Sequence, residues 1–203
     1  DLSLDDYVSS AICCSSSGNG TLSIQNSIIR DRLYLWYLEG SNVISRNIID
    51  NDDTKILLNN PSSNNIQIEN NLFKSAGVTA YANYISASSI LVVHNSFTDQ
   101  YKTALEVSAT GNNKGMLAKN NYFGTTDVAN IEFRILDVND SITREVAIEF
   151  LPILTNHHSD TPSNTEPSVD ITDGDRSITD TDGIAGESVS FTGTASDSDG
   201  TIA

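Results

Sequence analysis

Apolar and polar residues alternate in short runs that return along the chain in the same order. The clearest runs are IQNSII, ISRNII, IENNLF, VHNSFT and AKNNYF, whose third residues are Asn26, Arg46, Asn70, Asn95 and Asn120. Successive third residues are 20, 24, 25 and 25 positions apart, and such a period is typical of stacked repeat units. Apolar residues stand four and two positions before the third residue of nearly every run and again two positions after it, and this alternation predicts a short strand with one buried face.

A second apolar segment lies between successive runs, at residues 34–38, 56–58, 81–85 and 104–107. Turn-forming residues follow each of these segments. No long amphipathic segment with helix caps separates the runs, which argues against helical repeats and βαβ folds. We therefore predict an all-β parallel solenoid over residues 1–155, in which equivalent positions of successive coils stack into columns. Asn42 is the polar exception in an otherwise apolar column.

An asparagine stands at the third position of most runs, or directly after it. Asparagine tolerates the left-handed backbone conformation of a sharp bend, and stacked amides can hydrogen-bond from coil to coil. The predicted bend residues are Asn26, Asn47, Asn70, Asn95 and Asn120. Asn47 replaces Arg46 through a one-residue shift, and Asn71 and Asn121 are alternatives to their neighbours. We expect these residues to be structural and not catalytic.

The chain changes character after the last run. Residues 128–140 (VANIEFRILDVND) carry an apolar stripe with helical spacing, and residues 146–154 (VAIEFLPIL) form an apolar segment that predicts a terminal strand. A solenoid end needs a cover, because an open end would expose unpaired strand edges. We therefore expect residues 126–155 to form a C-terminal cap.

Residues 156–203 differ again, since they carry ten acidic residues and a single basic residue, Arg176. The polar stretch TNHHSDTPSNTEP predicts a linker over residues 156–167. Residues 168–203 alternate short strand-like segments with acidic turns and form a separate, partial module.

Two motifs carry family resemblances. The repeat period, the asparagine bend and the closing NNYFGTTD resemble the right-handed parallel β-helix of pectate-lyase-like proteins, with Phe123 where many secreted bacterial members have tryptophan. GESVSFTGTASDSDGTI resembles the opening strands of a PKD-like, immunoglobulin-type β-sandwich, which needs about 80–100 residues to close. The resemblances imply a secreted or cell-surface bacterial protein. Because the chain opens on DLSLDDYV without a leader, we expect a processed or excised piece.

The overall charge narrows the function classes. A formal net charge of −16 argues against nucleic acid as a partner, because phosphate binding needs a basic surface. No apolar run reaches the roughly 18 residues of a membrane span. Cys13 and Cys14 are adjacent, which favours two reduced thiols over a strained disulfide.

Acidic turns in the tail are candidate calcium ligands. Carboxylate pairs on turns beside glycine suit Ca²⁺, which takes several oxygen ligands. The candidate ligands are Asp173, Asp175, Asp180, Asp182, Asp197 and Asp199. The alternative is a solvated acidic linker, since none of the pairs completes an EF-hand loop.

Aromatic residues in the second strand set are candidates for sugar binding by ring stacking. They are Tyr34, Trp36, Tyr81, Tyr84 and Tyr101. Either parity of LYLWYL could face outward, so the alternative is that part of this set belongs to the core.

Catalysis has less support in the sequence. The resemblance implies lyases that use Lys or Arg, often with Ca²⁺, but the basic residues form no column beyond Arg30 and Lys74 with Asp50 between them. The leading expectation is a non-catalytic scaffold or binding surface for carbohydrate or an extracellular protein. One alternative is a polysaccharide lyase or glycoside hydrolase that acts on an acidic polysaccharide. A further alternative is a subunit of an extracellular assembly that self-associates through coil ends or the partial sandwich.

Overall fold

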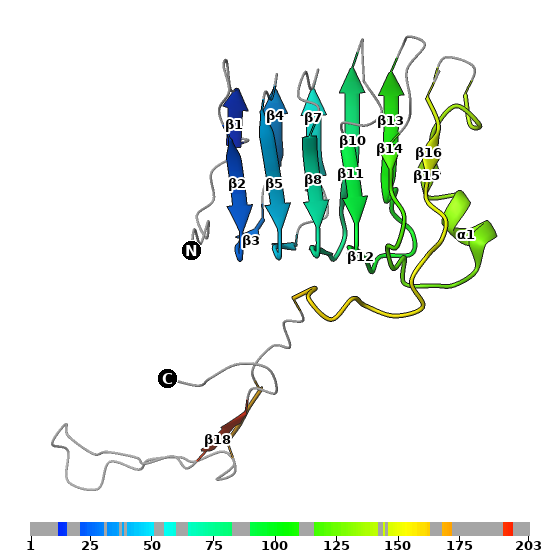
Figure 1. The fold of residues 1–203 in the computed structure, drawn as a ribbon. Helices are drawn as coiled ribbons and strands as arrows, with labels where there is room; N and C mark the ends of the chain where they lie inside the picture. The colour runs from blue at the N-terminus through cyan, green and yellow to red at the C-terminus, as the bar shows by residue number, and fades with distance from the viewer. Residues whose placement is uncertain are drawn as a thin grey trace, which may run out of the picture. The chain divides into compact units, whose positions relative to one another are not determined.

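The computed structural model contains two compact units, Asp1–Pro162 and Ser163–Ala203. It describes residues 12–15, 21–30, 32–36, 38, 40–50, 55–59, 65–82, 90–109, 116–141, 144, 146–162, 168–171 and 193–196. In the second unit, β17 (Ser168–Ile171) pairs antiparallel with β18 (Gly193–Ser196). The first unit is all-β apart from a short helix, and its parallel strands form the stack in Figure 1.

Three parallel sheets run along this stack. Sheet 1 consists of β1 (Ile12–Ser15), β4 (Leu33–Trp36), β7 (Lys55–Asn59), β10 (Gly77–Ala82), β13 (Leu105–Ala109) and β15 (Ile135–Leu136). Sheet 2 consists of β2 (Leu22–Gln25), β5 (Ser41–Ser45), β8 (Asn65–Glu69), β11 (Ile90–Val93), β14 (Met116–Leu117) and β16 (Ile148–Glu149). Sheet 3 consists of β3 (Ile28–Ile29), β6 (Ile48–Ile49), β9 (Leu72–Phe73) and β12 (Ser96–Phe97).

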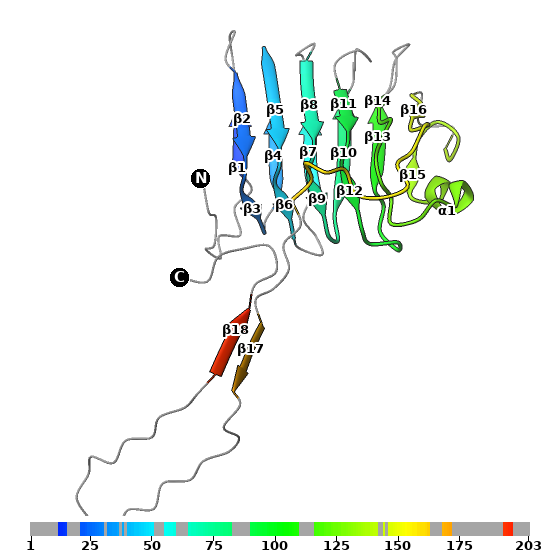
Figure 2. The same ribbon diagram turned by 60° about the horizontal axis from the view of Figure 1, so that its bottom comes forward.

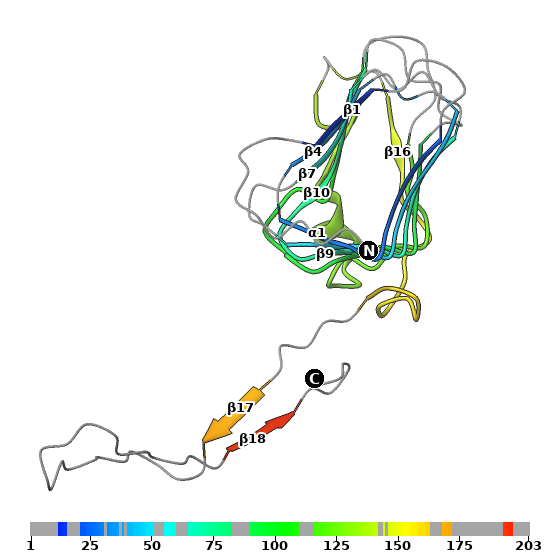
Figure 3. The same ribbon diagram turned by 90° about the vertical axis from the view of Figure 1, so that its left-hand side faces the viewer.

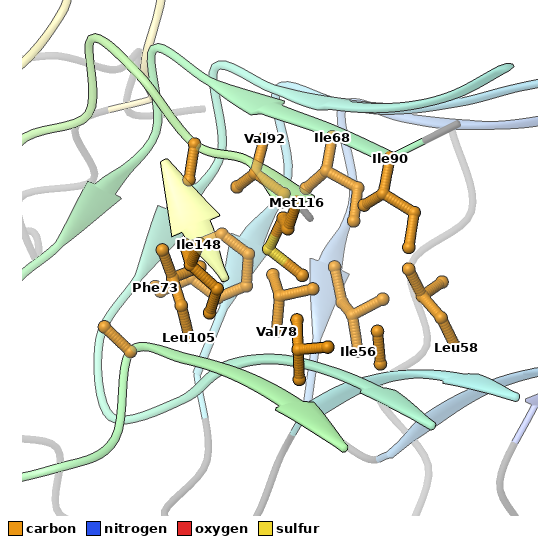
Figure 4. Packing of buried hydrophobic residues seen from close by; sticks show 14 of the residues in the cluster. Ile56, Leu58, Ile68, Phe73, Val78, Ile90, Val92, Leu105, Met116 and Ile148 are labelled. Carbon is orange, nitrogen blue, oxygen red and sulfur yellow. The ribbon is translucent and has the colours of Figure 1, made fainter. Parts of the chain in front are cut away.

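Each strand pairs with its equivalent one coil away, so the unit is a parallel β-solenoid, as the repeat predicted. Figure 3, which looks along the stack, shows the strands of successive coils one behind another around a common interior. Isoleucine, leucine and valine from the coils fill this interior (Figure 4). The predicted segment at residues 81–85 was placed too late in the chain, because the strand is β10 at Gly77–Ala82.

The register of one coil also differs from the sequence alignment. Ile90 pairs with Ile66 and Val92 with Ile68. In this coil the residue equivalent to Asn70 is therefore His94, one position before Asn95, on which the run VHNSFT was aligned. Phe97 therefore pairs with Phe73 and enters the interior. The Phe73 and Phe97 rings stack at 4.6 Å between centroids, and Phe97 and Phe123 at 5.3 Å. Phe123 thus closes an aromatic column inside the stack.

The predicted asparagine bend separates into two adjacent columns. One column adopts the left-handed conformation, with positive φ at Asn26, Arg46, Asn70, His94 and Asn120. The next residue in each coil is buried and forms the other column, Ser27, Asn47, Asn71, Asn95 and Asn121. The expectation that Asn47 and Asn95 form the bend is therefore wrong, since Arg46 and His94 have the positive φ, and Asn47 and Asn95 follow them in the buried column.

Hydrogen bonds connect the buried asparagines from coil to coil. The Asn71 Nδ2 donates to Asn95 Oδ1 at 2.9 Å and to the carbonyl oxygen of Ile44 at 2.9 Å. The Asn71 Oδ1 accepts hydrogen bonds from both the backbone N–H and the Nδ2 of Asn47, each at 3.0 Å. Each amide thus satisfies backbone groups that the corner of the coil leaves buried.

The last coil ends in a short helix and two short strands. Helix α1 spans Val128–Glu132, and the Asp127 side chain caps it by accepting the Ala129 N–H. The helical stripe predicted to residue 140 ends early, because Ile135–Leu136 joins sheet 1 as β15. Buried Arg134 fastens this region, since its Nε donates to the Lys102 carbonyl at 3.0 Å and its Nη1 to the Phe123 carbonyl at 2.6 Å. Burial lowers the pKa of Arg134, and nearby Asp99 opposes that shift.

The segment after β16 returns across the coils (yellow in Figure 2). The Leu154 N–H donates to the Asn121 carbonyl, and Thr161 Oγ1 donates to the His94 carbonyl at 3.0 Å. The His158 ring stacks on the His94 ring with 4.3 Å between centroids. Residues 156–162, expected to begin the linker, therefore pack against the solenoid. No helix among the described residues is long and apolar enough to cross a membrane.

Candidate functional site

The outward side chains of sheet 1 form two parallel rows, which together we call the outer face of sheet 1. Strand alternation turns Leu33 and Leu35 of β4 into the core, so Tyr34 and Trp36 point outward. The first row is Tyr34, Leu57, Thr79, Glu106 and Leu136, and the second row is Trp36, Asn59, Tyr81 and Ser108. The sequence left open which alternate residues of LYLWYL point outward. The burial of Leu33 and Leu35 shows that Tyr34 and Trp36 do.

The second row carries the exposed aromatic rings. Trp36 is 39% exposed and Tyr81 is 42% exposed, and the strand that carries Asn59 lies between them. Two strand spacings place their backbones about 9.5 Å apart. The Tyr34 ring lies 6.5 Å from the Trp36 ring at 47° between planes. By contrast, Leu57 and Thr79 of the first row are buried, so the accessible aromatic surface lies mainly along the second row.

A charged pair adjoins these rings. Arg144 Nη2 lies 2.8 Å from Glu106 Oε1, and their side chains are only 18% and 14% exposed, respectively. Thr79 Oγ1 donates a hydrogen bond to the other oxygen of this carboxylate, Oε2, at 3.4 Å. Both oxygens of Glu106 therefore have partners, which offsets the cost of removing its charge from water.

The phenol of Tyr81 responds to this environment. Partial burial raises its pKa, the negative charge of Glu106 and the neighbouring Tyr34 raise it further, and Arg144 opposes the shift. Tyr81 is therefore protonated at neutral pH and presents a hydrogen-bond donor beside its aromatic ring.

The predicted sugar-binding residues do not all lie on this face. Tyr34, Trp36 and Tyr81 lie together on it, as described above. Tyr101 lies outside the strands of sheet 1, with its side chain 96% exposed and its backbone N–H bonded to Asp99. Tyr84 lies outside the described residues, as do the candidate calcium ligands Asp173, Asp175, Asp180, Asp182, Asp197 and Asp199.

Sequence reasoning missed Glu106, Arg144 and Thr79 as members of the site. Glu106 and Arg144 are 38 residues apart, and Arg144 lies beyond the repeat, so no periodic signal joins them. Lys74 and Asp50, noted in the sequence, form an ion pair at 3.1 Å beside sheet 3 and not on this face. The described residues contain no group of three or more His, Cys, Asp or Glu side chains placed to hold a metal ion.

Comparison of the chain with protein-family models, with curated proteins and with solved structures gives no match. The chemistry of the outer face of sheet 1 is therefore argued from its own side chains. It offers exposed aromatic rings, an amide between them (Asn59), a hydroxyl at the end of the same row (Ser108), and one carboxylate that is already paired. This combination suits a ligand with apolar faces and many hydroxyl groups.

Proposed function

We propose that this chain is a non-catalytic binding surface for carbohydrate, carried on a right-handed, pectate-lyase-like β-helix of a secreted or cell-surface bacterial protein. In this proposal α1, β15 and β16 form the C-terminal cap, and residues 168–203 form part of a PKD-like module. The observation that carries the proposal is the row of Trp36, Asn59, Tyr81 and Ser108 along the outer face of sheet 1.

The spacing of this row suits an extended sugar chain. Pyranose rings present apolar faces that stack on aromatic side chains, and their hydroxyl groups need polar partners around the rings. Trp36 and Tyr81 provide the two stacking surfaces, and Asn59 and Ser108 provide hydrogen-bonding groups in the same row. A parallel sheet holds these groups at fixed intervals, so little conformational entropy is lost on binding.

The charged groups of this face favour binding over hydrolysis. Glycosidases of the usual kind need two carboxyl groups, about 5–10 Å apart, on either side of the scissile bond. Among the described residues of the two rows, Glu106 is the only carboxylate, and Arg144 and Thr79 engage both of its oxygens. Arg144 is likewise engaged by Glu106, which leaves it poorly placed to act as the base of a lyase.

Intrinsic fluorescence tests the proposal directly, because Trp36 is the only tryptophan of the chain. We expect titration with neutral and uronic-acid oligosaccharides to shift or quench the Trp36 emission for at least one of them. Tyr81→Ala should weaken that binding roughly fivefold, because it removes one aromatic stacking contact with the sugar. Tyr101→Ala is the matched control, because it removes a tyrosine outside sheet 1, and it should leave the affinity unchanged.

Two results would overturn the proposal. The first is an unchanged Trp36 emission with every oligosaccharide of the panel, together with equal behaviour of the Tyr81 and Tyr101 variants in pull-down on insoluble polysaccharide. The second is the appearance of unsaturated or newly reducing sugar ends during incubation with Ca²⁺, which would show that the face belongs to an enzyme.

A further inference from the structure

A cavity of about 410 Å³ opens at the C-terminal end of the stack. β15 and β16 are the last strands of sheets 1 and 2 there, and α1 lies beside them (Figure 1). Both strands and the helix contribute lining residues, among them Ile135, Ile148 and Glu132. The volume falls in the range of small-molecule sites. Neither Trp36 nor Tyr81 lines this cavity.

The inner part of the cavity is apolar. Ile135 and Ile148 are 3% and 6% exposed, and Phe150 packs edge-on against Phe123 at 6.4 Å between ring centroids. Phe133 also lines the cavity, although its side chain is 84% exposed. A large aromatic side chain that remains so exposed gains little from folding, but it can supply a wall for a bound molecule.

The polar part of the cavity is acidic. Glu132, Asp137 and Asp140 line it, and no Lys, Arg or His is among its described lining residues. No salt bridge among the described residues involves these carboxylates. Asp137 has a structural role, because its Oδ2 accepts the Ile148 N–H and its Oδ1 accepts the Asn139 N–H, both at 2.8 Å. Glu132 and Asp140 are exposed at the cavity, and Asp140 Oδ2 also accepts the Asp137 N–H at 2.9 Å, which leaves its other oxygen for a ligand.

We propose that this cavity binds a small organic cation, an alkylammonium group on an apolar body. Three carboxylates with no basic side chain among the described lining residues select a positive charge, and the apolar floor formed by Ile148 and Phe150 accepts the alkyl part of the ligand. The exposed ring of Phe133 adds a cation–π contact. A bare divalent metal ion fits less well, because both oxygens of Asp137 are already bonded to backbone N–H groups.

Choline and its uncharged isostere 3,3-dimethyl-1-butanol are the probes that separate charge from shape. We expect choline to shift the backbone amide NMR signals of residues around Phe133 and Phe150 in a saturable way. The isostere should bind at least threefold more weakly, and added salt should weaken choline alone, because exposed charge pairs are screened.

Variants then locate the site. Glu132→Gln and Asp140→Asn remove charge at constant shape, and each should weaken choline binding roughly threefold. Asp160→Asn is the matched control, because it removes one exposed carboxylate that does not line the cavity. Phe133→Leu keeps an apolar side chain but removes the aromatic face, and it should weaken choline binding roughly threefold without changing binding of the isostere.

The proposal is overturned if choline and the isostere bind equally, or if neither shifts the signals around the cavity. It is also overturned if Asp160→Asn weakens choline binding as much as Glu132→Gln and Asp140→Asn do, since the effect would then be one of overall charge. None of these outcomes bears on carbohydrate binding at Trp36, so each proposal can be rejected without affecting the other.

Discussion

The buried asparagine column and the outer face of sheet 1 are built by the same coils, yet their compositions differ sharply. The interior column repeats one chemistry through Asn47, Asn71, Asn95 and Asn121. The first outward row changes at every coil, from Tyr34 through Leu57 and Thr79 to Glu106. An interior residue has its own equivalents above and below it, whereas an outward residue faces solvent or a ligand.

This difference shows where function can arise in a repeat protein. A buried amide must match the amide in the next coil, because an unmatched partner leaves a polar group without a hydrogen bond in the interior. Outward positions carry no such requirement, so they can combine aromatic, amide and charged groups. The break in the repeat on the outer face of sheet 1 is therefore informative, and it supports our placing the binding site there.

The largest expected effect comes from breaking the interior column. Asn71→Ala removes the acceptor of two hydrogen bonds from Asn47 and the donor to Ile44. We expect the free energy of unfolding to fall by about 4 kcal/mol, because several buried polar groups lose their partners at once. Urea unfolding followed by far-UV circular dichroism measures this loss.

Asn70→Gly is the matched control for that variant, since it replaces the neighbouring asparagine. Asn70 has a positive φ of 55°, and its side-chain oxygen accepts no hydrogen bond among the described residues. Glycine adopts this conformation readily, so the change in stability should stay within about 1 kcal/mol. Equal losses for the two variants would contradict the separation of the asparagines into two columns.

A smaller effect is expected on the outer face. Glu106→Gln and Arg144→Met each break a pair that is mostly buried, and we expect each to lower the free energy of unfolding by about 1–2 kcal/mol. The double variant should lose less than the sum of the two single losses, because the partners interact directly. Additive losses would show that the 2.8 Å contact contributes nothing to stability.

The smallest effect is a pH dependence. The pKa of Tyr81 is raised in the folded chain by burial and by Glu106, so folding favours the protonated phenol. Its contribution to stability is present below the ordinary pKa of about 10 and is lost as the pH rises through the raised value. Spectrophotometric titration of phenolate should show one late-ionising group that disappears in Tyr81→Phe, and whose pKa falls in Glu106→Gln. An unchanged titration curve in Tyr81→Phe would contradict this assignment.

Much of the fold could be predicted from the sequence, and the errors have physical causes. Alternation within a strand is a local property, so the inward columns at Ile44 and Ile68 are visible in the runs themselves. In sheet 3 the alternation points to Leu72, whereas the structure turns the next residue, Phe73, into the interior, because the left-handed bend resets the alternation. The bend was misplaced at Asn95, because two columns one residue apart both favour asparagine. His94 occupies the bend instead: the left-handed position holds Asn, Arg and His in different coils, whereas the buried column holds asparagine in every described coil after that of Ser27.

The sequence by itself determined the parallel solenoid, its coil period and most of its interior, because these follow from strand alternation repeated at a nearly constant interval. Only the tertiary structure decided which outward side chains meet. Trp36 and Tyr81 come to lie in one row on either side of Asn59 through a strand register that depends on connecting segments of unequal length. Glu106 meets Arg144, which lies beyond the repeat and outside the strands. Stacking then converts distant positions into neighbours about 5 Å apart, and no pattern along the chain records which neighbours those are.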